Sequence, residues 1–466
     1  MLLHSEKKTK IILQVRDLLL LPKSECAIYR HRIFFLFNLV LILFSACNNE
    51  VAENRTPTVE VRYEKGRARL YRHGKPYLIK GAAGIQHLDL VAEYGGNSVR
   101  TWSLHDAERI LDEAHQLGLT VTLGVEIGRP AWGNDFNYGK FWQVDEKIEE
   151  LRPFIEKYKN HPALLMWGVG NEVKEYGGGS RPVVFYITDK VAKMIKEVDP
   201  NHPTMTAVDV FSQNRIASYR HLMPNIDILG FNAFQKIDKA FERVYEEKGW
   251  GKAFMLSEWG SDGHWEVTGT EWGAPKELSS SEKRALTEKY WDKISEDSSM
   301  LVGSYAFYWG YKYEATPTWF SLFSQEGYKT ESLHFLKYAW SGQRAENSAP
   351  NITDMVIETD QGAVNDNVYL ENNREYVAKA LTEDPDGDSL TYRWEIRHEG
   401  NYFIEREGYD YTVSDYSMEN LIQNVDDNSV RFKAPEEEGP YRIFIFAYDG
   451  VENVASHNIP FYVVTK

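Results

Sequence analysis

Regular alternation of apolar and polar positions begins at Val59. It runs over Val59–Tyr63, breaks at a Lys65-Gly66 turn, and resumes over Ala68–Tyr71 before a second turn at His73–Pro76. A period of two between turn residues predicts a β-hairpin. Because this hairpin precedes the main domain, we expect it to cover the lower end of that domain.

Eight short runs that are apolar almost throughout follow the hairpin, as expected of strands buried on both faces. They are Leu78–Gly84, Asn97–Trp102, Thr120–Ile127, Leu164–Glu172, Pro203–Val210, Asp227–Phe234, Phe254–Gly260 and Gly303–Trp309. Segments of helical period lie between them: Asp106–Leu117, Asp145–Lys157, Val183–Val198, Ile237–Lys248 and Ser281–Glu296. Strands that alternate with helices indicate an α/β fold with a parallel sheet. Eight units in about 250 residues favour a (β/α)8 TIM barrel. The alternative, a doubly wound open sheet, lacks a glycine-rich phosphate turn after its first strand.

The pattern changes to short strands after a polar stretch between Tyr338 and Pro350. Turn residues, including the acidic run Glu383–Asp388, separate the alternating segments Glu375–Ala380, Leu390–Ile396, Ser429–Lys433, Tyr441–Tyr448 and Ile459–Val464. This pattern is typical of an immunoglobulin-like β-sandwich of about 100 residues. We therefore predict a barrel with its hairpin over residues 59–342 and a C-terminal sandwich over residues 350–466.

The N-terminus has the layout of a secretory signal. Arg30-His31-Arg32 precedes the apolar run Ile33–Phe44, and Ser45-Ala46-Cys47 follows it, which is the order of n-region, h-region and small-residue site. A cysteine after small residues resembles a bacterial lipobox. We expect residues 1–47 to be a signal peptide with Cys47 lipidated, and residues 48–58 to be a tether. The alternative is an uncleaved membrane anchor, but the run is short for a spanning helix of about 20 residues. The expected location is the outer membrane or cell surface, or else the periplasmic face.

Charge and aromatic content narrow the class of ligand. The formal net charge of −16 argues against nucleic acid or an anionic membrane surface, since both need a basic face. Aromatic residues make up 14% of the chain, and flat apolar rings suit the C–H faces of sugars. Both observations agree with an oligosaccharide or polysaccharide substrate. We expect a monomer.

Two glutamates end predicted strands four and seven. Glu172 closes Trp167–Glu172, and Glu258 lies in Leu256–Gly260. In a TIM barrel the carboxyl ends of the strands face the active site, so the two side chains converge across the barrel mouth. Retaining hydrolysis of a glycosidic bond needs one carboxylic acid and one nucleophilic carboxylate about 5 Å apart. Asn171 is placed to bind the 2-hydroxyl of the reacting sugar. The alternative for either glutamate alone is a surface or capping residue.

The residues around these glutamates resemble the clan A glycoside hydrolases, in Gly96–Trp102, His161–Glu172 and Phe254–Gly260. The resemblance implies Glu172 as acid/base, Glu258 as nucleophile and Arg100 as the arginine that supports the nucleophile. Gly74–Gly81 is similar to the lead into a family 2 barrel. Asp227–Asn232 is similar to family 72 glucanosyltransferases, and the two-domain layout is similar to family 158 endo-β-1,3-glucanases. An endo-β-1,3-glucanase is therefore the expected activity. A glucanosyltransferase, an exo-acting β-glycosidase and a non-catalytic glycan-binding lipoprotein are the alternatives.

One position departs from the clan pattern. Many members carry a tyrosine after strand six that donates to the nucleophile, whereas this chain has Phe231-Asn232-Ala233-Phe234-Gln235. Asn232, Gln235 and Tyr308 are the open candidates for that donor.

Further substrate-binding candidates are aromatic residues near strand ends: Trp102, Trp132, Trp259, Trp309 and Trp319. We interpret His87 and His105 as helix or loop residues. Asp384, Asp386 and Asp388 have the alternate spacing of a calcium loop, but the EF-hand pattern is incomplete, and we interpret them as a solvated turn. No cofactor or metal is expected.

Overall fold

The computed structural model describes residues 57–130, 136–173, 181–210, 213–297, 299–399, 414 and 416–465. The chain divides into two compact units, Met1–Thr56 and Pro57–Lys466. The predicted signal, Cys47 and nearly all of the predicted tether lie outside the described residues. None of the helices in the described part combines the length and the apolar character needed to cross a membrane.

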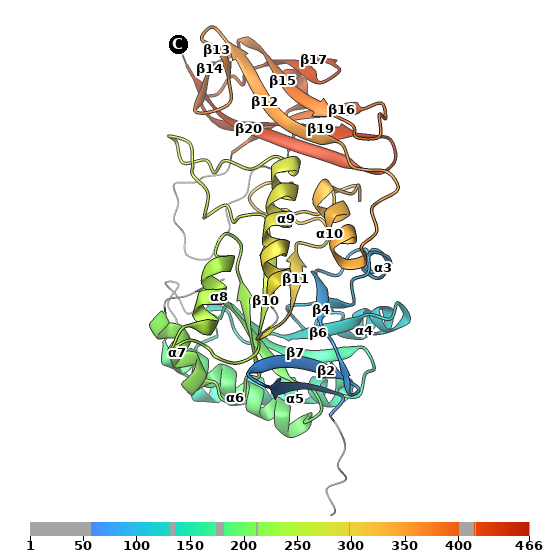
Figure 1. The fold of residues 1–466 in the computed structure, drawn as a ribbon. Coiled ribbons are helices and arrows are strands. Elements are labelled where there is room, and N and C mark those ends of the chain that lie inside the picture. The colour runs from blue at the N-terminus through green and yellow to red at the C-terminus, as the bar shows by residue number, and fades with distance from the viewer. Residues whose placement is uncertain are drawn as a thin grey trace, which may run out of the picture. The chain divides into compact units, whose positions relative to one another are not determined.

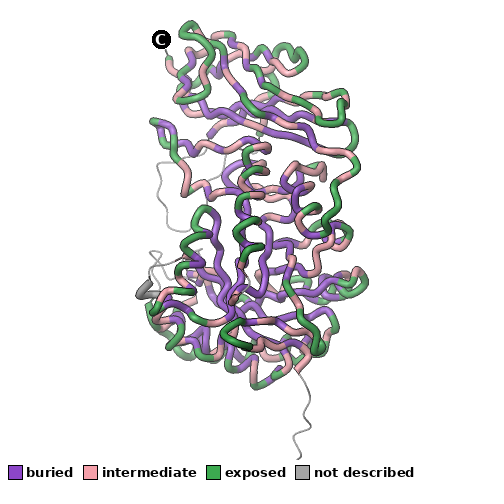
Figure 2. The backbone as a smooth tube through the Cα atoms, viewed as in Figure 1, coloured by how far each residue is buried: buried purple, intermediate pink, exposed green. Residues whose placement is uncertain are grey.

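A closed barrel of eight parallel strands forms the centre of the larger unit (Figure 1). Its strands are β4 (Ile79–Ala83), β5 (Ser98–Arg100), β6 (Thr120–Val125), β7 (Leu164–Asn171), β8 (Thr204–Asp209), β9 (Ile228–Asn232), β10 (Phe254–Gly260) and β11 (Leu301–Phe307). Each falls within or overlaps one of the eight predicted apolar runs, so the TIM barrel prediction is confirmed. Figure 2 shows the barrel strands buried along their lengths, which is why their sequences are apolar on both faces.

Helices connect the strands. They are α3 (Leu88–Glu93), α4 (Ala107–Gln116), α5 (Phe141–Tyr158), α6 (Pro182–Val198), α7 (Gln213–Leu222), α8 (Ile237–Tyr245), α9 (Ser280–Glu296) and α10 (Glu331–Ser341). The five predicted helices are confirmed. The sequence analysis missed α3, which is only six residues long, and α7, whose sequence has no apolar stripe. It also missed α10, although Leu333, Leu336 and Trp340 are buried at helical spacing.

The predicted hairpin covers the lower end of the barrel. Strands β1 (Val59–Glu64) and β2 (Arg67–Arg72) pair antiparallel, and a short β3 (Lys75–Pro76) joins them. The backbone N–H of Val59 donates to Asn201 O at 3.0 Å, and that of Ala68 donates to Ser299 O at 2.7 Å. Because Asn201 and Ser299 precede β8 and β11, the hairpin lies at the amino ends of the barrel strands, opposite the catalytic end.

The C-terminal domain is a sandwich of two sheets, as predicted. Its strands are β12 (Asn351–Thr359), β13 (Gly362–Val364), β14 (Val368–Glu371), β15 (Glu375–Glu383), β16 (Thr391–His398), β17 (Ile422–Asp426), β18 (Ser429–Lys433), β19 (Gly439–Tyr448) and β20 (Val454–Val464). One sheet has the order β13-β12-β15-β18-β17 and the other β14-β20-β19-β16. Alternate residues from both sheets share one buried apolar core.

The start of α9 joins the barrel to the sandwich. Ser279 caps the helix in a capping box with Glu282, whose backbone N–H donates to Ser279 Oγ at 3.2 Å. The next two serines accept hydrogen bonds from the sandwich: Ser280 Oγ from Ser456 N at 3.0 Å and Ser281 Oγ from Ile352 N at 2.9 Å. The polar residues at this helix start therefore cap the helix and also hydrogen-bond the sandwich to the barrel.

The acidic turn of the sandwich is held by its own side chains. Asp384 Oδ1 accepts from the backbone N–H groups of Asp386 and Asp388, both at 2.9 Å. Carboxylate oxygens of Asp384, Asp388 and Asp449 lie within 4.8 Å of one another, while Asp449 accepts from the backbone of Val451 and Asn453. These bonds fit the interpretation of the acidic run as a turn.

Candidate active site

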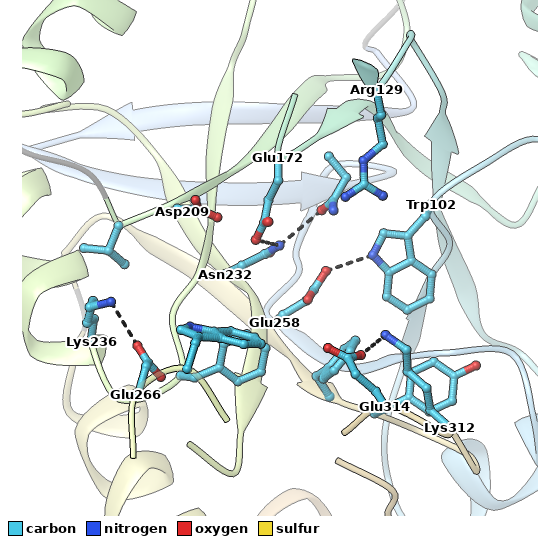
Figure 3. A pocket seen from close by; sticks show the side chains of 16 residues that line it. Trp102, Arg129, Glu172, Asp209, Asn232, Lys236, Glu258, Glu266, Lys312 and Glu314 are labelled. Atoms are coloured by element: carbon cyan, nitrogen blue, oxygen red, sulfur yellow. Dashed lines mark hydrogen bonds and ion pairs between the residues drawn. The ribbon is translucent and has the colours of Figure 1, made fainter. Parts of the chain in front are cut away.

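A cavity of about 740 Å³ opens at the carboxyl ends of the barrel strands (Figure 3). Both glutamates singled out in the sequence face it. Its lining residues are Trp102, Arg129, Asn171, Glu172, Asp209, Val210, Asn232, Phe234, Lys236, Glu258, Trp265, Glu266, Phe307, Tyr308, Lys312 and Glu314. The end of the barrel at which these side chains gather is the end where TIM barrels carry their chemistry.

Glu258 is a buried carboxylate with two charged or polar donors on one oxygen. Its side chain lies in β10 and is 6% exposed. Arg100 Nη1 donates to Glu258 Oε1 at 2.7 Å, and the indole N–H of Trp102 donates to the same oxygen at 2.8 Å. Arg100 is itself 2% exposed and also donates to Ser257 O at 2.9 Å. The guanidinium and the indole N–H thus hold this buried carboxyl group in one orientation.

Glu172 lies just beyond β7 in a left-handed backbone conformation, with φ of 46°. Its backbone N–H donates to Ala207 O at 2.9 Å, and its Oε1 accepts from the side-chain amide of Asn232 at 2.8 Å. Ser257 Oγ fixes the orientation of that amide by donating to Asn232 Oδ1 at 2.8 Å. The two carboxylates therefore share one cavity, in which Arg100 and Trp102 donate to Glu258 and Asn232 donates to Glu172.

Asn171 links the two halves of the site. Its Oδ1 accepts from Arg100 Nη2 at 2.6 Å and from Asn232 Nδ2 at 3.2 Å. Because these bonds fix the carbonyl oxygen, the NH2 group of Asn171 is the group that can donate to a ligand in the cavity.

The donor that the clan pattern places after strand six comes from a different strand in this protein. Asn232 donates to Glu172, and Gln235 Nε2 donates to Asp262 Oδ2 at 3.2 Å. Tyr308 stacks on Trp102, with ring centroids 6.0 Å apart and an interplanar angle of 20°. Among the described contacts, none of these three open candidates donates to Glu258, and Trp102, after β5, does so instead.

Three of the predicted sugar-stacking tryptophans are core residues, and this part of the prediction is wrong. Trp309 is 0% exposed and stacks on Trp340 at 5.6 Å. Trp259 is 0% exposed and lies against Trp291, while Trp319 is 1% exposed and donates to Asp262 O. Rings enclosed on all sides offer no face to a sugar. Trp132 lies outside the described residues.

Aromatic groups that the sequence analysis passed over line the cavity in their place. They are Phe234, Trp265 and Phe307, together with Tyr308, which it considered only as a hydrogen-bond donor. Burial raises the pKa of Tyr308, so its phenol stays neutral. Trp265 is 55% exposed at the cavity and packs on His264, whose pKa burial lowers to about 4. Phe307 and Tyr308 are neighbours that both line the cavity, so the alternation of a strand does not single them out, and no local pattern in the sequence marked these four side chains.

Neither histidine considered in the sequence belongs to the site. His87 stacks on Phe323 with ring centroids 4.4 Å apart, and the side chain of His105 is 85% exposed beside Asp106. Neither lines the cavity.

Lysines at the cavity are paired with carboxylates (Figure 3). Lys236 Nζ lies 3.1 Å from Glu266 Oε1, and Lys312 forms an ion pair with Glu314. Asp209 adds a further carboxyl group to the lining. With Arg129, the lining holds three cations against five carboxyl groups, so the cavity has no excess of positive charge.

Comparison with known families agrees with this geometry. Residues 82–314, half of the chain, match the family described as glycosyl hydrolases family 2, TIM barrel domain. The chain belongs to this family. The expected clan of glycoside hydrolases thus holds, and the part of the resemblance that pointed to family 2 is confirmed. The likeness to families 72 and 158 finds no support in the comparisons.

Two similar curated proteins each match less than half of this chain. The β-glucuronidase of Rattus norvegicus is 26% identical over 223 residues, which is 44% of this chain and 31% of that protein. A β-galactosidase of Bacteroides ovatus is 23% identical over 253 residues, covering 47% of this chain and 27% of that protein. The chain thus spans about a third of the length of these relatives. Among solved structures, a β-glucuronidase of Bifidobacterium dentium is 19% identical with a TM-score of 0.49, covering 61% of this chain and 49% of that one.

Proposed function

We propose that this protein is a retaining β-glycoside hydrolase, with Glu258 as nucleophile and Glu172 as general acid/base. The observation that carries the proposal is the pair of carboxylates on one cavity with unlike partners. A carboxylate held by Arg100 and Trp102 is oriented for attack on an anomeric carbon. A carboxyl group beside an amide is suited to carrying a proton.

The bonding pattern around Glu258 indicates which atom attacks. Arg100 and Trp102 both donate to Oε1, so Oε2 is the oxygen presented to the sugar. In the first step Oε2 bonds to the anomeric carbon as the glycosidic C–O bond breaks and Glu172 protonates the leaving oxygen. In the second step the water oxygen bonds to the anomeric carbon as Glu172 takes a proton from that water. The bond to Oε2 breaks, Glu258 is restored as the carboxylate, and the sugar is released with net retention. The NH2 group of Asn171 serves as donor to the 2-hydroxyl.

For the substrate, we favour a neutral β-linked glycan. An acidic sugar favours a site with an excess of cations, whereas the five carboxyl groups that line this cavity outnumber its three cations, Arg129, Lys236 and Lys312, and both lysines are paired with glutamates. The finer proposal of an endo-β-1,3-glucanase rests on the resemblance in sequence. β-Glucuronide hydrolysis is the second candidate, because the similar mammalian proteins bear that name.

The test is a panel of aryl β-glycosides and polysaccharides followed by proton NMR. We expect turnover of a neutral aryl β-glycoside with the β-anomer of the product appearing first. Release of reducing ends from a β-1,3-glucan supports the finer proposal. If the β-glucuronide is the only substrate turned over, the acidic substrate is correct and the neutral one is wrong. If the α-anomer appears at early times, Glu258 is not the nucleophile. Product analysis at high oligosaccharide concentration separates hydrolysis from glycosyl transfer.

We also propose a monomeric lipoprotein anchored through Cys47, on the strength of the signal-like residues 30–47. Metabolic labelling with a radioactive fatty acid, compared between the full chain and Cys47→Ser, tests the anchor. Sedimentation velocity of residues 57–466 tests the monomer.

A further inference from the structure

Residues 308–321, which we call the strap, follow the last barrel strand and form one wall of the cavity. Tyr308, Lys312 and Glu314 of the strap all line the cavity. The strap is closed on itself by Ser321, whose Oγ accepts from Lys312 N and donates to Lys312 O, both at 3.0 Å. Three cavity side chains therefore depend on where this one segment is held.

The middle of the strap is bound to the C-terminal sandwich. Tyr313 is the residue between Lys312 and Glu314. Its hydroxyl accepts from Arg397 Nη1 at 2.9 Å and donates to Ser414 O at 2.7 Å. Because Tyr313 joins two cavity-lining residues directly, its anchor fixes the backbone of both.

Arg397 is a firm anchor. It lies in β16, is 8% exposed, and its Nε donates to Glu395 Oε2 at 2.8 Å. Glu395 is 7% exposed and also faces Arg393, with Nε 3.1 Å from Oε1. A buried ion pair with this many directed bonds has little freedom to move, since each lost bond leaves a desolvated charge.

A second anchor holds the far part of the strap. Thr316 Oγ1 donates to Glu277 Oε2 at 2.6 Å, and Thr318 Oγ1 donates to Glu277 Oε1 at 2.8 Å. The same carboxylate accepts from Asn458 Nδ2 of β20 at 2.8 Å. Although burial alone raises it, the charges of Lys283 and Arg442 hold the pKa of Glu277 below its usual value. An ionised Glu277 thus ties the strap to the sandwich a second time.

We propose that the C-terminal sandwich builds the strap wall of the active-site cavity, with Tyr313 and Arg397 as positioning residues for substrate binding. The sandwich is then part of the site and not a spacer. The two glutamates lie on the ends of β7 and β10, outside the strap. Loosening the strap therefore weakens substrate binding more than it slows the bond-breaking step. This inference rests on the proposed function for its kinetic readout, and a second readout is independent of it.

The experiment compares Tyr313→Phe and Arg397→Met with a matched control, Lys379→Met. Tyr313→Phe removes one hydroxyl and keeps the ring, and Arg397→Met leaves Glu395 paired with Arg393. Lys379 also forms an ion pair on the sandwich, with Glu358 at 2.6 Å, but both partners are exposed. Two quantities are measured: kcat and KM on an aryl β-glycoside, and the rate of endoproteinase cleavage after Lys312, followed by mass spectrometry.

We expect KM to rise roughly three- to tenfold in Tyr313→Phe, as for loss of one buried hydrogen bond, and at least as much in Arg397→Met, which also loses the bonds of Arg397 to Ser414 O and Glu395. In both variants kcat should stay within about twofold of wild type. Cleavage after Lys312 should accelerate in both, and the control should match wild type in both readouts. Unchanged KM together with unchanged cleavage in both variants overturns the proposal. So does a KM rise in Lys379→Met equal to theirs, because that marks general destabilisation. Since proteolysis needs no turnover, a wild type that cleaves no glycoside refutes the proposed function while the strap is still tested.

Discussion

At the scale of residues, two glutamates on one cavity are given different chemistry by their partners. Arg100 and Trp102 converge on one oxygen of Glu258, while the amide of Asn232 contacts Glu172. The nearest neighbours of a carboxylate decide whether it holds a proton, so the assignment of roles can be tested by removing one carboxylate at a time.

Glu258→Ala and Glu172→Ala should fail in different ways. Loss of the nucleophile should remove turnover of every substrate. Loss of the acid/base should slow glycan cleavage by about 10²- to 10⁴-fold but largely spare formation of the intermediate from aryl glycosides, whose leaving groups need no proton. Added azide should then rescue Glu172→Ala and give a β-glycosyl azide. Equal responses of the two variants to leaving group and azide would contradict the assignment.

Trp102→Phe should lower kcat/KM by roughly 10- to 100-fold, the range for a hydrogen bond to a charged group. The ring is kept, so stacking on Tyr308 survives, but the indole N–H to Glu258 is lost. Because that N–H orients the attacking carboxylate, the loss should appear in formation of the glycosyl-enzyme intermediate. Trp142→Phe makes the same chemical change at a side chain that is 60% exposed and outside the cavity lining. A kcat/KM of Trp102→Phe equal to that of Trp142→Phe would show that the N–H does not act on the nucleophile.

At the scale of elements, the segment just after β11 holds a cavity position next to a core position. Tyr308 lines the cavity, and the next residue, Trp309, packs under α10 against Trp340. We expect Trp309→Ala to cost about 3–5 kcal/mol of unfolding free energy, as for other buried large-to-small changes. Tyr308→Ala should instead raise KM with a smaller loss of stability. Denaturant unfolding and steady-state kinetics of both variants measure this, and a KM effect confined to Trp309→Ala would reverse the assignment.

The first residue of α10 makes stability depend on pH. Burial raises the pKa of Glu331 to about 7, although the hydrogen bond that Ser281 Oγ donates to its carboxyl group at 2.5 Å acts in the opposite direction. The folded state thus favours the protonated form. The stabilisation that the protonated carboxyl group gives the folded state is fully present below the ordinary pKa of 4.5 and is lost as pH rises through 7. Between pH 5 and pH 8 the wild type should lose on the order of 2–3 kcal/mol of unfolding free energy through this group, and Glu331→Gln should not show that loss. The measurement is the difference in unfolding free energy between variant and wild type at each pH, and a difference that stays constant with pH refutes it.

At the scale of the whole molecule, the sandwich has its own core yet shares buried polar groups with the barrel. Arg442 is 0% exposed, and its Nη2 donates to Pro275 O at 2.7 Å, while Asn458 donates to Glu277. Polar groups buried at a domain boundary stabilise the joined form, because separation leaves them without protein partners.

We predict that residues 350–466 fold when expressed alone, since their core is contained within the two sheets. The fragment 57–349 should unfold at a lower temperature than residues 57–466 and bind substrate less tightly, because its strap has lost Arg397 and Asn458. Calorimetry of both fragments and of the joined chain measures this. Equal transition temperatures and equal KM for 57–349 and 57–466 would show that the sandwich is dispensable. The isolated sandwich should show no affinity for laminarin.

Local pattern in the sequence determined the elements and their class. Eight apolar runs predicted the eight barrel strands, because a strand buried on both faces excludes polar side chains wherever it lies in the chain. The same local logic placed Glu172 and Glu258 at strand ends, where a carboxylate inside an apolar run has no role in the core. Two-residue alternation predicted the hairpin and the sandwich.

Only the tertiary structure decided which side chains meet. Trp309 and Tyr308 are equally aromatic in the sequence, and barrel closure alone turns one toward Trp340 and the other toward the cavity. Trp102 reaches Glu258 across 156 positions of the chain, and Arg397 reaches Tyr313 across 84. Burial and hydrogen-bond partners are set by residues far away in sequence, which no local pattern encodes. The sequence therefore determined the barrel and its two glutamates. Folding determined their partners and made the sandwich part of the wall around them.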